Sequence, residues 1–66
     1  MAKIHVVMSS GHEFTISRAF YGAEGAMSSQ DAQIQGTFLL SKMASVGTDQ
    51  GPVINAAQVS HLWVEG

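Results

Sequence analysis

The sequence predicts an all-β, or mainly β, domain built as a small five-stranded barrel or a curved antiparallel sheet. Three observations favour this fold class. Apolar and polar residues alternate with period two over residues 3–9, 13–17 and 59–64, which is typical of half-buried strands. Turn-forming residues separate the first two segments. The 66 residues of the chain fit one small domain and no more.

The first two segments predict a β-hairpin. Large apolar residues occupy every second position and so share one face of each strand, namely Ile4, Val6 and Met8, then Phe14 and Ile16. Between them lies the sequence Ser-Ser-Gly-His, in which Gly11 supplies the positive φ that a tight hairpin requires.

Residues 18–33 interrupt the alternating pattern with glycines, alanines and paired serines. We interpret residues 20–33 as a loop inserted into the domain. Ser28 or Ser29 is suited to cap a short helical turn within it. Irregular segments of this length are uncommon in compact domains and are often functional.

Residues 34–46 have two interpretations. Gly36, Thr37 and Phe38 favour a third strand, which would then be apolar on both faces. Over residues 37–44 the competing interpretation is a helix, because the two leucines and Met43 also fit a helical spacing. We favour the strand.

The last part of the chain predicts two strands separated by a single helical turn. Pro52 is tolerated where a strand begins, and Asn55 is suited to cap one turn of 3₁₀ or α helix over residues 55–58. The final strand follows over residues 59–64. The predicted core combines the inward residues of all segments: Ile4, Val6, Phe14, Ile16, Phe38, Leu40, Ile54, Leu62 and Val64.

The composition predicts self-association. Only 12% of the residues are charged and 45% are hydrophobic, whereas about 25% are charged in a typical soluble domain. A core this small usually needs an additional source of stability, and the chain has no cysteine to form a disulfide. We therefore expect the chain to be its own partner, through apolar residues opposite the predicted core: Val7, Leu39, Met43 and Trp63. A different protein partner is the alternative.

The charges argue against a nucleic-acid backbone as ligand. The net charge is −2, with three basic residues, so the basic stripe typical of phosphate binding is absent from the sequence. Non-specific DNA binding is not expected, although a ring of subunits would still suit a small anionic ligand. Arg18, Phe20 and Tyr21 are the candidate ligand-binding residues, because a guanidinium beside two aromatic rings can stack a base and contact a phosphate. Alternatively, the two aromatic residues merely cap the end of the fold.

Neither metal nor catalytic chemistry is predicted. His5, His12 and His61 do not follow a zinc-ligand spacing. The sequence from Ser9 to Glu13 contains a serine, a histidine and a carboxylate, but we interpret it as a turn, because a triad needs its members to converge from separate elements. We therefore expect no catalytic residue, no cofactor and no enzyme activity. The short apolar run near the N-terminus predicts neither a leader nor a membrane span, and a cytoplasmic protein is expected.

The predicted order of elements resembles that of SH3-like and Sm-like small barrels. The resemblance lies in Val53-Ile54, the turn at residues 55–58 and the strand beginning Val59-Ser60-His61-Leu62, which are similar to the closing half of Sm-like RNA-binding proteins. The insertion at residues 20–33 and the scarcity of basic residues depart from that family. The small, cysteine-free, charge-poor chain also looks like a phage- or prophage-encoded protein. We thus expect a non-enzymatic homo-oligomeric binding or accessory protein, with an oligomeric Sm-like binder of RNA or small nucleotides as the alternative that the resemblance implies.

Overall fold

The computed structural model describes residues 2–19 and 27–66, and these residues form mostly strands, with one α-helix and one 3₁₀ turn. The mainly β prediction is therefore confirmed. In chain order the elements are β1 (Lys3–Met8), β2 (Glu13–Ile16), α1 (Ser29–Lys42), β3 (Ser45–Gly47), β4 (Val53–Asn55), the 3₁₀ turn η1 (Ala56–Gln58) and β5 (Val59–Glu65).

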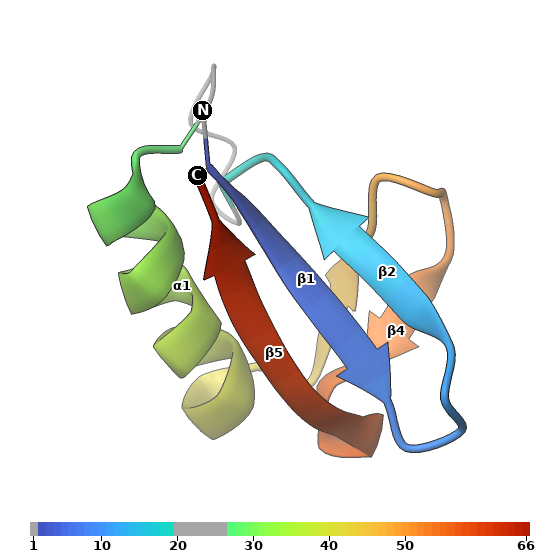
Figure 1. The fold of residues 1–66 in the computed structure, drawn as a ribbon. Helices are drawn as coiled ribbons and strands as arrows, with labels where there is room; N and C mark the ends of the chain where they lie inside the picture. The colour runs from blue at the N-terminus through green and yellow to red at the C-terminus, as the bar shows by residue number, and fades with distance from the viewer. Residues whose placement is uncertain (1, 20–26) are drawn as a thin grey trace.

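A three-stranded antiparallel sheet in the order β2-β1-β5 forms one layer of the fold (Figure 1). The predicted hairpin joins β1 to β2, and Gly11 in its turn has the expected positive φ of 93°. In the register of the sheet, Val6 lies opposite Phe14 on one side and Leu62 on the other. The alternation of β1 therefore directs Ile4 and Val6, both fully buried, to the core side.

The second layer consists of α1 and the antiparallel pair β3–β4. Figure 1 shows α1 beside β5, and β4 behind β1 and β2. Val46 of β3 lies opposite Ile54 of β4, and both side chains are buried in the core. Leu39 of α1 is fully buried there as well. The core thus lies between the three-stranded sheet and this mixed layer.

The strand predicted for residues 34–46 is wrong, because residues 29–42 form α1. Ser28 is the N-cap, and its Oγ accepts a hydrogen bond from the backbone N–H of Asp31 at 3.1 Å. Asp31 in the first turn and Lys42 in the last turn both suit the helix dipole. The loop predicted for residues 20–33 also ends earlier than expected, since residues 29–33 belong to this helix; residues 20–26 lie outside the described residues.

The helical spacing also corrects the predicted core. Leu39 is fully buried, whereas the predicted core residues Phe38 and Leu40 are 36% and 54% exposed. In a strand, residues 38 and 40 would share a face and residue 39 would point away. In a helix the buried residues recur three or four positions apart. The three buried positions of α1 follow this rule: Ala32, Gly36 and Leu39.

Gly36 allows α1 to lie close to β5. A Cβ atom at this position would come within 2.9 Å of Leu62 Cδ1, which is closer than carbon atoms pack without displacement. A glycine inside a helix costs about 1 kcal/mol relative to alanine. At this position the cost is offset by the direct packing of the helix backbone against the Leu62 side chain.

The strands form two sheets and do not close into a barrel in the described part of the chain. The loop between β3 and β4 instead contacts the outer edge of β2. Asp49 N–H donates to Thr15 O at 2.8 Å, and Thr15 N–H donates to Gln50 Oε1 at 2.9 Å. Ser17 N–H also donates to Asp49 Oδ1 at 3.1 Å. Side chains and loop backbone thus replace a neighbouring strand at this edge.

The predicted 3₁₀ turn is confirmed at η1. Asn55 caps it, because its Oδ1 accepts a hydrogen bond from Ala57 N–H at 3.0 Å. Pro52 precedes β4, as expected from its position at a strand start. Among the residues described, no helix has both the length and the apolar character needed to cross a bilayer.

Replacing Leu39 by alanine should lower the free energy of unfolding by about 2–5 kcal/mol, because it removes a fully buried side chain. Leu40→Ala is the matched control and should change it by less than about 0.5 kcal/mol, because Leu40 is exposed. Urea denaturation followed by circular dichroism measures both. A larger loss for Leu40→Ala than for Leu39→Ala would contradict the helix and support the original strand.

Candidate functional site

The side of the three-stranded sheet that faces away from the core carries a group of apolar and aromatic residues. His5 and Val7 of β1 lie opposite Trp63 and His61 of β5. We call these four residues the open face. Both α1 and the β3–β4 pair lie on the other side of the sheet (Figure 1). Trp63 is 44% exposed, so a large aromatic side chain lies at the surface near the centre of this face.

Two imidazole rings hold the indole of Trp63 in place. The His5 ring lies parallel to it, with ring centroids 5.0 Å apart and planes inclined by 6°. The His61 ring is 6.0 Å away and inclined by 21°. His5 Nε2 also contacts the Glu65 carboxylate. Stacked aromatic pairs favour such offset, nearly parallel arrangements, so the partly exposed indole packs against both imidazoles.

The charges around the open face are few and mixed. Lys3 lies opposite Glu65, and Glu13 lies opposite Val7, on the same side of the sheet. All three charged residues are exposed. One lysine and two carboxylates do not create the positive potential that a phosphate backbone requires. The composition of this face, with an exposed tryptophan and little charge, is instead typical of the centre of a protein interface.

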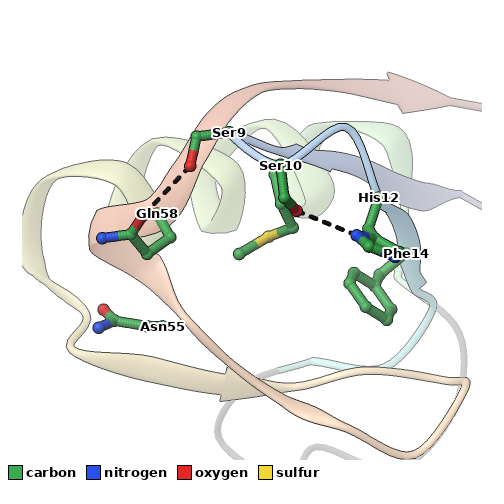
Figure 2. A pocket seen from close by; sticks show the side chains of 7 residues that line it. Ser9, Ser10, His12, Phe14, Asn55 and Gln58 are labelled. Atoms are coloured by element: carbon green, nitrogen blue, oxygen red, sulfur yellow. Dashed lines mark hydrogen bonds between the residues drawn. The ribbon is translucent and has the colours of Figure 1, made fainter.

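A second candidate site is a cleft of about 450 Å³ at the hairpin end of the sheet. Figure 2 shows its side chains, which come from the end of β1, the turn, β2, the end of β4 and η1. Met8 and Phe14 provide the apolar lining, and the other lining residues are polar: Ser9, Ser10, His12, Asn55 and Gln58. Ser9 Oγ donates to Gln58 Oε1 at 3.1 Å, which ties the turn to η1.

Within this cleft Ser10 Oγ lies 3.0 Å from His12 Nδ1, a contact that the sequence did not predict. A nucleophilic serine needs a third group that orients the histidine and donors for the developing oxyanion. Among the residues described, no carboxylate contacts His12. Both Ser10 and His12 are exposed, and the hydrogen bond between them lies within the turn of the hairpin.

The predicted ligand-binding residues are only partly described. Arg18 is exposed and lines a hollow of about 280 Å³ together with Asp49 and Thr48. Phe20 and Tyr21 lie outside the described residues. The proposed combination of a guanidinium and two aromatic rings therefore stays a prediction.

The structure separates the four residues predicted for the oligomer interface. Val7 and Trp63 lie together on the open face, one half-buried and the other exposed. Leu39 is fully buried within the chain, and Met43 is half-buried and packs against the same core. The helix α1 explains this separation. It directs Leu39 and Met43 toward the core, whereas a strand would have placed both on an outer face.

Some site residues were missed by the sequence analysis, which assigned His5 and His61 no role. The alternation of side chains along each strand could have indicated them, because His5 shares a strand face with Val7 and His61 shares one with Trp63. The cleft at the hairpin end had no sequence signal, because residues as distant as Ser9 and Gln58 form it. For metals, no three His, Asp or Glu side chains gather in residues 2–19 and 27–66.

No protein-family model, curated protein or solved structure matches this chain.

Ser10 should not react with a fluorophosphonate probe, because its only activating neighbour is His12, which no carboxylate orients in the described structure. The mass of the intact protein after prolonged incubation with excess probe measures this. A stoichiometric adduct that disappears in Ser10→Ala and persists in the matched variant Ser9→Ala would show that the pair is catalytic.

Proposed function

We propose that this chain is a non-enzymatic binding or accessory protein that works as a homo-oligomer, and that the open face is its contact surface. The observation that carries the proposal is Trp63, which is 44% exposed and stacks with two imidazole rings on a sheet face that no other described element covers. An exposed tryptophan whose ring is already packed loses little conformational entropy when a partner covers it.

Size and composition support the same conclusion. A chain of 66 residues with 12% charged residues has a small core and an apolar surface, and association stabilises such folds by mass action. The fully buried side chains Ile4, Val6 and Leu39 form a modest core. Covering the open face adds buried apolar area at about 25 cal/mol per Å².

Binding of RNA or small nucleotides has weaker support from the same face. A base would have to stack on Trp63, but one face of the indole is already covered by His5 at 5.0 Å. The neighbouring charges are Lys3, Glu13 and Glu65, which repel phosphate more than they attract it. Protein contact is therefore the better interpretation. The cytoplasmic location and the phage-like origin stay predictions from the sequence.

Light scattering coupled to size exclusion at about 100 µM should give a mass of at least two chains for the native protein, since a standard interface of about 800 Å² per partner gives affinities in the micromolar range or tighter. Trp63→Thr should give the monomer mass, because it removes the exposed ring but retains a residue that favours strands.

Val53→Thr is the matched control for this experiment. Val53 is 71% exposed but lies on β4, away from the open face, so its replacement should leave the oligomer intact. A native protein that is monomeric at this concentration would contradict the proposal, and so would a Trp63→Thr variant that retains the native mass.

A further inference from the structure

The outer side of α1 carries two large apolar side chains. Ile34 is 60% exposed and Phe38 is 36% exposed. They are four residues apart, so they are neighbours on the helix surface. This pair lies roughly 150° around the helix from the buried positions of α1, which include Gly36 and Leu39. We call Ile34 and Phe38 the outer stripe of α1.

The outer stripe and the open face lie on different sides of the molecule. Figure 1 shows α1 as an outer element of the fold, beside β5, and α1 packs on the core side of the three-stranded sheet. The open face is on the other side of this sheet. A second copy that covers the open face therefore leaves the outer stripe exposed. The side of a helix opposite its buried side is usually polar, so the outer stripe is a candidate for a second contact surface.

The hydroxyl groups beside the outer stripe are already hydrogen-bonded within the helix. Thr37 Oγ1 donates to Gln33 O at 3.1 Å, and Ser41 Oγ donates to Thr37 O at 2.8 Å. Covering a polar group that has no hydrogen-bond partner costs free energy. Because both hydroxyls have an acceptor in α1 itself, a partner can cover them without supplying one.

The charges of α1 have a two-fold pattern. Asp31 lies in the first turn and Lys42 in the last turn, and both lie on the same flank of the outer stripe, about 40–60° from its centre. The midpoint between the two charges falls less than one residue from the midpoint between Ile34 and Phe38. A two-fold rotation about this point therefore exchanges the two apolar residues and the two charges together. Neither charged residue forms an ion pair within the part of the chain that the structure describes.

We infer that α1 pairs antiparallel with α1 of a second copy through the outer stripe. Ile34 then packs against Phe38 of the second copy, and Phe38 against Ile34 of the second copy. Asp31 lies beside Lys42 of the second copy at each end of the contact. A parallel pair would instead place like charges side by side. A second copy is therefore the occupant that the outer stripe fits, because one rotation pairs its apolar residues and its opposite charges.

The pairing of α1 is sterically compatible with the rest of each chain. Paired helices lie about 8–10 Å apart. The side of α1 that packs on Leu62 through Gly36 points away from the contact, so the two sheets lie at its outside. The open face of each copy stays accessible. The inference thus goes beyond the proposed function, because the open face joins two chains and α1 joins such pairs into assemblies of four or more.

A single α1 contact is expected to be weak. One helix side offers few residues in comparison with the roughly 20–30 residues per side of a standard interface. A chain that lacks the Trp63 contact therefore stays monomeric at about 100 µM and pairs through α1 only at higher concentration. This difference in strength lets the two contacts be measured separately.

Sedimentation equilibrium on the Trp63→Thr variant isolates the α1 contact. Between about 0.1 and 2 mM, its mass should rise from one chain toward two. Adding Ile34→Gln should weaken this association at least about tenfold, because it places a polar amide in the apolar centre of the contact. Leu40→Gln is the matched control and should leave the affinity within about twofold, because Leu40 lies roughly 140° around the helix from the outer stripe. Leu40 is also exposed, at 54%.

Exchanging the two charges tests the antiparallel arrangement in the same background. At about 20 mM ionic strength, where screening is weak, Asp31→Lys should weaken the association at least about fivefold, because two lysines then meet at each end. Adding Lys42→Glu should restore the affinity to within about twofold. An effect on the helix dipole predicts the opposite order, because both substitutions place an unfavourable charge at a helix end and the double variant would then be the weaker one.

The native protein gives a second readout that retains Trp63. At about 1 mM, its mass should correspond to four or more chains, and Ile34→Gln should reduce it to two. Circular dichroism checks that each variant is folded. A native mass that stays at two chains would overturn the pairing of α1 and leave the proposed function standing. Equal effects of Ile34→Gln and Leu40→Gln, or a charge exchange that restores nothing, would overturn it as well.

Failure of the proposed function has a different signature. A Trp63→Thr variant that keeps the native mass at about 100 µM, but becomes monomeric when Ile34→Gln is added, would refute the open face as the contact surface. The same result would support the pairing of α1.

Discussion

The alternation of side chains along β1 is the constraint on which the rest of this structure depends. β1 pairs on both sides, so its register fixes the faces of β2 and β5 as well as its own. Ile4 and Val6 enter the core because of it, and His5 and Val7 are turned to the open face. A shift of one residue would exchange these two sets. The core and the candidate interface are therefore two consequences of one pairing.

The second layer is assembled around that sheet from unlike elements. α1 packs closely on β5 only because Gly36 leaves room for Leu62. The β3–β4 pair is tied to β2 through Asp49 and Gln50 rather than through a strand ladder. This arrangement covers one edge of the sheet and leaves the other without a backbone partner in the described region.

The histidines connect the monomer to its proposed assembly. His5 stacks on Trp63 and contacts Glu65, so the indole is packed against another side chain within the single chain. Preorganised aromatic side chains lose little entropy on binding and often dominate interface energetics. Neither histidine joins a cluster of acidic or imidazole ligands in the described residues. In this structure both imidazoles stack with the indole of Trp63.

The sequence by itself determined the hairpin, the 3₁₀ turn, the last strand and the placement of Val7 and Trp63 on the same face, because these depend on local alternation and turn residues. It did not determine α1. Phe38, Leu39 and Leu40 satisfy a strand or a helix equally well, and the choice follows from packing Leu39 and Gly36 against a sheet whose strands come from both ends of the chain. The hydrogen bonding at the sheet edge was likewise decided only by the tertiary structure, because Thr15 is distant in sequence from its partners Asp49 and Gln50.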